Sequence, residues 1–228
     1  MKKVISILLA LTLALSVCSV AAFADTAPAT KTDALFEKLA NTKELQVSVT
    51  PDSKFGMGFE VSDITVYIKD DNIAVDTKLG FLPVRAALLD KSFYAYCPSF
   101  PFAYISASGL GLDLVGFDSG IWELIDKSLD AAELLLAYVK SYEENVNGTI
   151  YSVEEYNDRE YVTTKFYYQG DVLKFISVYD SADKSTQITT INSYSFSVDD
   201  GIFKKPVGID ITKLLKLIGV IEALPLAA

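Results

Sequence analysis

The side chains used most often for acid–base and transition-metal chemistry are scarce in this chain, which contains no histidine and only two cysteines. Histidine is the usual general base near neutral pH and the commonest ligand for zinc and copper. Cys97 is the only cysteine beyond the first 24 residues, which excludes an internal disulfide or a cysteine-rich zinc cluster there. It lies between Tyr96 and Pro98, where we expect a buried, unreactive thiol. The composition therefore predicts a protein with no metal, no cofactor and no catalytic site.

One motif resembles a serine-based catalytic site. Ser181-Ala182-Asp183-Lys184 fits the Ser-x-x-Lys pattern of penicillin-recognising enzymes, in which the serine opens a buried helix beside its lysine. Here the tetrapeptide lies in a polar turn between two predicted strands. The companion Ser-Asp-Asn and Lys-Thr-Gly elements are also absent from the chain. We interpret the match as a coincidence.

Two pairs of neighbouring carboxylates are the remaining catalytic candidates, because a glycosidase needs only two acids held about 5–10 Å apart. Glu143-Glu144 closes a predicted helix in polar surroundings. Glu154-Glu155 lies within a predicted strand, where adjacent side chains point to opposite faces and cannot share one substrate. Both pairs are therefore expected to be solvated charges, and a histidine-free hydrolase is the third of three functional hypotheses.

The first 24 residues have the tripartite pattern of a secretory signal peptide. Lys2 and Lys3 precede an apolar run over 4–17, and Ala22-Phe23-Ala24 supplies small residues before the cleavage site. The apolar run is shorter than the roughly 20 residues that cross a bilayer. We expect cleavage after Ala24 and secretion of a bacterial protein out of the cytoplasm.

Cys18 offers an alternative fate, because a cysteine that follows an apolar leader can be the lipid-attachment site of a bacterial lipoprotein. The residue before such a cysteine is normally Gly, Ala or Ser, and here it is Val17. Secretion as a free protein is therefore favoured over membrane tethering by a lipid on Cys18.

The chain is acidic. Without Lys2 and Lys3, 18 of the 20 basic residues remain against 30 acidic ones, a net charge near −12. A field of this sign repels polyanions, so nucleic acid is not an expected partner. We expect a flexible lead-in over 25–33, a single domain over 34–210, and an apolar C-terminal helix within 211–228.

A first group of short β-prone runs follows a helix that is predicted from a cap at Thr32 or Asp33 to Ala40. Turn residues such as Asp70-Asp71-Asn72 and Asp90-Lys91 separate the runs, and connections this short join antiparallel neighbours. The predicted strands of this first meander are 45–50, 54–69, 72–79, 83–90, 91–97 and 101–107.

An amphipathic helix is predicted next, within 117–145, and a second meander follows it. Charged residues occupy most of the helix surface outside one apolar stripe, formed by Ile121, Ile125, Leu129, Ala132, Leu136 and Val139. Asn147-Gly148-Thr149 after the helix matches an N-glycosylation acceptor. Gly170-Asp171 is a strong hairpin signal between two aromatic runs. The predicted strands of the second meander are 148–157, 160–169, 171–180 and 186–198.

The last predicted helix, 211–224, is apolar on nearly all sides. At 1.5 Å per residue it reaches only about 21 Å, which is too short to span a bilayer. It therefore packs on a sheet, or it contacts a membrane or a partner protein with its exposed side. Together these elements predict an α+β fold, a curved antiparallel sheet with amphipathic helices packed on its concave face.

Aromatic side chains crowd two of the predicted strand pairs. Such residues form ordinary cores, but in a curved sheet capped by helices they could also line an apolar cavity for an acyl chain. Together with the predicted helix over 119–140 they give these candidate ligand-lining residues: Phe93, Tyr94, Tyr96, Phe102, Tyr104, Trp122, Ile125, Leu129, Phe166, Tyr168 and Phe175.

The order of elements resembles the LolA-like lipoprotein carriers and their Gram-positive lipoprotein relatives. Three stretches carry the resemblance: the hairpin over 165–174, Ile188-Thr189, and the segment 203–210 with its Phe-x-x-Pro-x-Gly pattern. The resemblance covers about 35–210. It implies a half-open β-barrel with helices as its lid.

Two functional hypotheses rank above the histidine-free hydrolase. The first is an extracytoplasmic, non-enzymatic protein with an apolar cleft for a lipid or a lipidated partner. The second is a secreted envelope module without a small-molecule ligand, whose aromatic residues are plain core and whose C-terminal helix binds another envelope protein.

Overall fold

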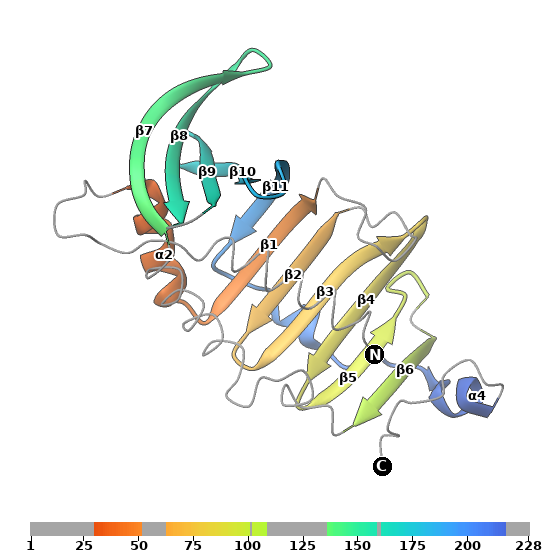
Figure 1. Ribbon diagram of the computed structural model, residues 1–228. Coiled ribbons are helices and arrows are strands. Elements are labelled where there is room, and N and C mark those ends of the chain that lie inside the picture. Colours follow the sequence, from red (N-terminus) through yellow and green to blue (C-terminus); the bar gives the residue numbers. More distant parts are fainter. Residues whose placement is uncertain (1–29, 52–62, 101, 109–135, 159–160, 218–228) are drawn as a thin grey trace. The chain divides into compact units, whose positions relative to one another are not determined.

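The computed structural model describes residues 30–51, 63–100, 102–108, 136–158 and 161–217 (Figure 1). The predicted signal peptide, Cys18 and most of the predicted inserted helix lie outside these ranges and stay predictions. The described chain is mostly β, with twelve strands, and it divides into two compact units. None of the described helices is long and apolar enough to cross a membrane.

The first unit is an antiparallel sheet with one helix, built from the described residues of 30–42, 49–51, 136–158 and 161–193. Its strands follow the order β11-β10-β9-β8-β7, and the end of β1 lies beside β11, where Asn192 Nδ2 donates to Thr50 Oγ1 at 2.9 Å. Its elements are α2 (Lys31–Ala40), β7 (Leu136–Val146), β8 (Thr149–Asp158), β9 (Val162–Gln169), β10 (Val172–Asp180) and most of β11 (Ser185–Ser195).

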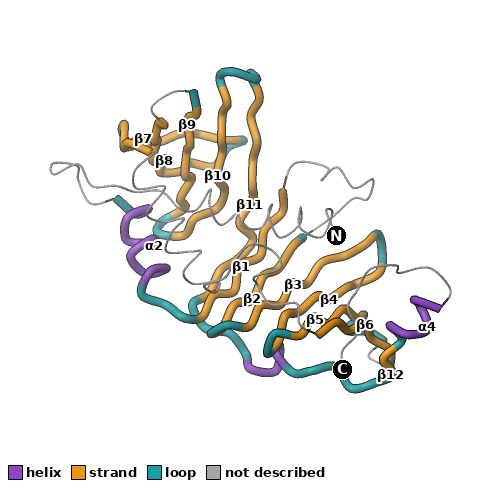
Figure 2. Tube along the Cα trace, turned by 60° about the horizontal axis from the view of Figure 1, so that its bottom comes forward, coloured by secondary structure: helices purple, strands orange, loops and turns teal. Residues whose placement is uncertain are grey.

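The second unit is a meander of five strands with a short parallel strand added at one side (Figure 2). The start of β1 lies beside β2 in this unit, where Thr65 Oγ1 donates to Ser48 Oγ at 3.1 Å. The elements are β1 (Glu44–Pro51), β2 (Ile64–Lys69), β3 (Asn72–Leu79), β4 (Leu82–Leu89), β5 (Ser92–Tyr96), β6 (Ala103–Ser108), the 3-10 helix η2 (Asp200–Phe203), β12 (Ile209–Asp210) and α4 (Thr212–Leu217).

The predicted antiparallel meanders are confirmed, and most described strands begin and end within two residues of their predicted limits. The hairpin residues explain this agreement. Asp90 and Lys91 have φ of 48° and 61°, and Gly170 has φ of 61°, the left-handed values that tight two-residue turns require. Turn chemistry of this kind is local, so the sequence alone reveals it.

The prediction that the inserted helix continues over residues 136–145 is wrong. Residues 136–146 form β7, the outer half of a long curved hairpin with β8 (Figure 1). A bulge at Val139 shifts the register between Tyr138 and Lys140. The apolar residues of this stretch also fit helical spacing, but hydrogen bonding to β8 decides the outcome. The fold is therefore mostly β rather than evenly α+β, and helices on a concave face stay a prediction.

Helix α2 begins earlier than predicted, with Thr30 as its cap in place of Thr32 or Asp33. The Thr30 side chain accepts from Asp33 N at 3.0 Å, and Asp33 Oδ2 accepts from Thr30 N at 2.8 Å, which is a capping box. The buried face of the helix contacts the first unit's sheet, where the Phe36 and Phe166 rings meet edge to face at 6.1 Å. Packing on β9 therefore fixes α2 to the sheet.

The β7–β8 turn gives a first test. Asn147 and Gly148 have φ of 53° and 87°, and a side chain at Gly148 would meet no atom within 4 Å. Only backbone strain should therefore oppose Gly148→Val, and we expect the free energy of unfolding to fall by about 1–2 kcal/mol. Gly148→Asn is the control, because asparagine tolerates left-handed φ and should retain most of the stability. Urea denaturation measures both variants, and equal losses would contradict the strained turn.

Candidate functional site

One face of strands β2–β6 in the second unit carries apolar side chains throughout its described part. Cross-strand partners share a face, so the pairs Val66–Val75, Ile73–Leu88, Ala86–Ala95 and Ala95–Ile105 define it. Among its described side chains none is charged, and Thr77 supplies the one hydroxyl. We call this set the apolar face: Ile64, Val66, Ile68, Ile73, Val75, Thr77, Leu82, Val84, Ala86, Leu88, Phe93, Ala95, Ala103, Ile105 and Ala107.

Burial varies across the apolar face. On the apolar face, the three β2 side chains Ile64, Val66 and Ile68 are buried, and so are Ile73 and Ala107. A block on β3–β6 is only half-buried, and its members are Val75, Val84, Ala86, Leu88, Phe93, Ala95 and Ile105. Half-buried apolar surface without a charged neighbour on the same face suits contact with hydrocarbon.

The opposite face of the same strands is polar and is covered by η2. Ala74, Ala87 and Leu89 form a small buried cluster there, against which Ile202 and Phe203 pack. Beside them the Arg85 guanidinium donates to both Asp76 oxygens at 2.6 Å, and these hydrogen bonds raise the pKa of Arg85 further above its ordinary value. The opposite face therefore combines a small apolar cluster with charged side chains, which the described part of the apolar face lacks.

The candidate ligand-lining residues divide between these faces. Phe93 lies on the apolar face, whereas Tyr94, Tyr96 and Tyr104 lie on the opposite one, where the Tyr94 and Tyr104 rings are 6.0 Å apart. Phe102 is exposed at the turn before β6. Strand alternation separates the residues that the sequence analysis grouped as one aromatic run.

The other candidates lie in the first unit or outside the described ranges. Phe166 and Tyr168 of β9 are fully buried on the side that α2 covers. Phe175 lies on the reverse side, stacked on Tyr167 with centroids 4.0 Å apart. Trp122, Ile125 and Leu129 are outside the described residues. The lining role of the whole set stays a prediction.

Glu154 is the most buried carboxylate of the described chain, and it holds the start of α2. Its Oε1 accepts from Lys31 N at 2.8 Å, and its Oε2 accepts from Thr32 N at 3.0 Å and Thr32 Oγ1 at 2.5 Å. Since Thr32 gives its proton to Glu154, the Tyr168 hydroxyl at 2.9 Å donates to Thr32. The amino-terminal end of a helix favours a negative charge, so this carboxylate is stabilised where it lies.

Glu155 occupies the reverse face of β8, as the alternation of the strand predicted. It accepts from the Tyr142 hydroxyl at 3.1 Å and lies 3.8 Å from the amines of Lys140 and Lys165. The two neighbouring carboxylates therefore point away from each other and cannot form one acid–base pair.

The other predicted chemical motifs have ordinary structural positions. Residues 181–184 form an exposed turn after β10, in which Asp180 Oδ1 accepts from Ala182 N at 2.8 Å. Cys97 is half-buried and unpaired rather than fully buried. Within the described ranges, no group of three side chains that could ligate a metal ion comes together.

The sequence analysis missed the aliphatic residues of the apolar face. Phe93 and Ala95 alternate with Tyr94, but along β4 only Arg85 interrupts the apolar residues, because Ala87 and Leu89 of the opposite face are apolar too, so the period of two is weak there. Alanine is small and weakly apolar, and the aromatic residues were the more conspicuous signal. Scoring each face separately would have found the set.

Glu154 and Glu155 provide a matched pair of variants. Glu154→Gln places an amide N–H₂ group against hydrogen-bond donors, so we expect the free energy of unfolding to fall by about 2–4 kcal/mol. Glu155→Gln weakens two long contacts of 3.8 Å to Lys140 and Lys165 and keeps a side-chain oxygen that can accept from Tyr142, so it should cost less than about 1 kcal/mol. Urea denaturation followed by circular dichroism compares them, and similar losses would show that Glu154 does not hold α2.

Comparisons with known proteins identify similar folds. No family model and no curated protein matches the sequence. Among solved structures, LprF from Mycobacterium bovis matches 76% of this chain and 93% of its own at 8% identity and a TM-score of 0.43. Lipoprotein LppX from Mycobacterium tuberculosis matches 72% and 96% at 10% identity and a TM-score of 0.36. A putative outer membrane lipoprotein-sorting protein domain from Vibrio parahaemolyticus matches 75% and 93% at 9% identity and a TM-score of 0.23. In structure the chain is distantly similar to LprF, LppX and a lipoprotein-sorting domain.

Proposed function

We propose that this protein works outside the cytoplasm and binds the acyl chains of a lipid, or of a lipidated partner, along the apolar face. The observation that carries the proposal is the half-buried block on β3–β6, which no charged side chain of that face interrupts. The absence of histidine from the chain supports binding without turnover. The signal-peptide pattern before Ala24 supports the location.

Burial of methylene groups sets an upper limit on the affinity for an acyl chain. Each buried methylene contributes about 0.8 kcal/mol. About ten methylenes laid on the face would contribute roughly 8 kcal/mol, which corresponds to a dissociation constant near 1 μM before the cost of ordering is subtracted.

Native mass spectrometry of the purified protein should find a bound amphiphile, and a delipidated sample should take up a fluorescent fatty acid with saturation. A sample that emerges empty and fails to bind the fatty acid would refute the proposal.

Ala86 lies near the middle of the half-buried block, and its substitution tests where the lipid binds. Ala86→Asp places a charge against the acyl chain, and we expect the affinity for a fluorescent fatty acid to fall at least about tenfold, since an unpaired charge is costly in an apolar environment. Fluorescence titration measures the change.

Ala137→Asp is the matched control, because it makes the same substitution at an exposed position on β7 of the other unit. It should leave fatty-acid affinity unchanged. Ala86→Ser is a milder variant for the case in which Asp prevents folding, and it should weaken binding in the same direction. Unchanged affinity in a folded Ala86→Asp protein would place the ligand elsewhere.

A second candidate function is protein recognition through the C-terminal helix, and exposed Leu214 on α4 favours it. Under this hypothesis Leu214→Ser abolishes capture of an envelope protein and leaves fatty-acid uptake unchanged. Under the lipid hypothesis the uptake depends on Ala86 and is independent of Leu214.

A further inference from the structure

Exposed large apolar side chains of the second unit gather at one end of its meander. Successive hairpins turn at alternate ends, so the turns after β3 and β5 lie together at one end, and the turns after β2 and β4 lie at the other. Phe81 stands at the first of these turns, with 95% of its surface exposed. Phe100 and Phe102 stand at the second, 62% and 72% exposed.

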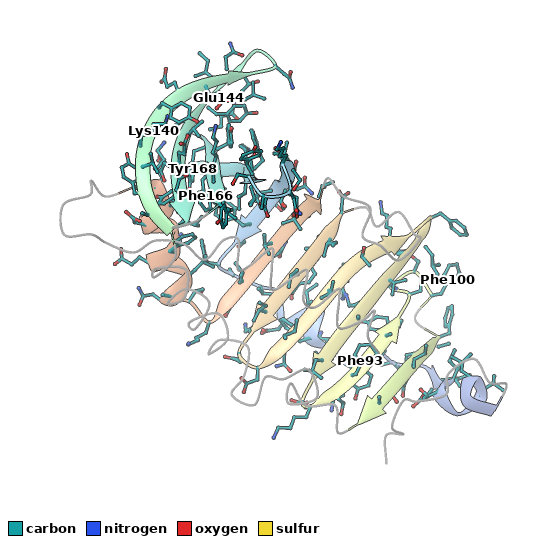
Figure 3. All side chains as sticks on the ribbon, in the orientation of Figure 1. Phe93, Phe100, Lys140, Glu144, Phe166 and Tyr168 are labelled. Atoms are coloured by element: carbon teal, nitrogen blue, oxygen red, sulfur yellow. The ribbon has the colours of Figure 1, made fainter. Side chains whose placement is uncertain are left out.

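Strand β12 adds to the same end. Ile209 pairs with Ala103 at the start of β6 and donates its N–H to Phe102 O at 2.7 Å, and its side chain is 70% exposed. Figure 3 shows Phe100 beyond the strand ends, whereas Phe93 lies within the sheet. We call the set the aromatic rim: Phe81, Leu82, Phe100, Phe102 and Ile209.

The two ends of the meander have opposite chemistry. The stretches 79–84 and 95–107 surround the turns after β3 and β5, which carry Phe81, Phe100 and Phe102. Neither stretch contains an acidic or basic residue. At the other end the turns consist of Asp70-Asp71 and Asp90-Lys91. Lys78, on the polar face, is the nearest cation along β3. One end of the unit is therefore suited to hydrocarbon and the other to water.

The rim is continuous with the apolar face. Leu82 belongs to both sets, and Ala103 at the start of β6 carries the apolar face to the turn that holds Phe102. An acyl chain that entered at the rim would reach Val84 and Ile105 without passing a charged side chain of that face.

We propose that the aromatic rim inserts into the outer layer of a lipid bilayer and is the end by which lipid enters or leaves the apolar face. Phenylalanine side chains at turn tips can enter the boundary between headgroups and acyl chains, as apolar side chains of interfacial proteins do. The chain has a net charge of −10, so its attachment depends on insertion and not on attraction to anionic lipid. This inference rests on the proposed lipid-binding function.

Vesicle flotation tests the rim. The purified protein should float with phosphatidylcholine vesicles equally at low and high salt, and should bind less to vesicles rich in phosphatidylglycerol. The triple variant Phe81→Ser, Phe100→Ser, Phe102→Ser should lose on the order of tenfold in vesicle affinity for each phenylalanine removed. Its urea midpoint should match that of the parent, because all three side chains are exposed. Phe81→Ser alone, at the most exposed turn, serves if the triple variant fails to fold.

Tyr161→Ser is the matched control, since Tyr161 is an aromatic residue 60% exposed in the other unit. It should float like the parent. Uptake of a fluorescent fatty acid from solution should be unchanged in both variants, whereas transfer of a fluorescent lipid out of vesicles should fail only in the triple variant.

The outcomes separate the two proposals. A parent protein that takes up fatty acid but does not float refutes the rim and leaves the binding function intact. A parent that floats but takes up no lipid refutes the binding function and, with it, the entry role of the rim. A dimer in sedimentation that the triple variant dissociates, without flotation of the parent, would make the rim a contact between two copies and overturn the inference.

Discussion

The register of the antiparallel ladders is the constraint on which the chemistry of this protein depends. The pairs Ala86–Ala95 and Arg85–Tyr96 are next to each other along strands β4 and β5, yet their side chains lie on opposite faces of the sheet. A slip of one residue would place Arg85 among the apolar side chains and turn Ala86 toward η2. Left-handed residues in the two-residue turns, such as Gly80 with φ of 62°, prevent that slip. Turn geometry therefore decides which side of the sheet can meet hydrocarbon.

In the first unit a single carboxylate has a comparable role. Glu154 is buried, but both of its oxygens accept hydrogen bonds from the first turn of α2, and burial raises the pKa of the neighbouring Tyr156, so that hydroxyl remains a neutral donor and acceptor. Among the described residues, no buried side-chain nitrogen or oxygen lacks a hydrogen-bond partner. A satisfied polar network of this kind specifies one position for the helix on the sheet, whereas the Phe36–Phe166 contact alone would tolerate others.

Local signals explain how much of this structure could be predicted from the sequence. Strand limits followed from turn residues, and the opposite orientations of Glu154 and Glu155 followed from the geometry of any strand. The helix prediction at 136–145 was wrong because the apolar residues of this stretch fit the spacing of a helix as well as that of a strand. Pairing with β8 makes the stretch a strand, and pairing with another segment cannot be read from the stretch itself. The pair Asn147-Gly148 was the overlooked hint, since it is the strongest two-residue hairpin signal and not merely a glycosylation pattern. Strand β12 exists only through its parallel pairing with β6, which no local pattern encodes. The candidate site was predicted from aromatic residues of two strand pairs and apolar residues of the helix over 119–140, whereas the described strands separate the aromatic residues by face.

Among the described strands, β7 pairs with β8 alone and ends the ladder of the first unit. A strand of 11 residues at the end of a ladder is a template on which further copies could add and grow into fibres. The bulge at Val139 breaks the regular spacing of the β7 amides, and Lys140, Glu143 and Glu144 place charge along the same strand. These irregularities act against the addition of a further strand along β7.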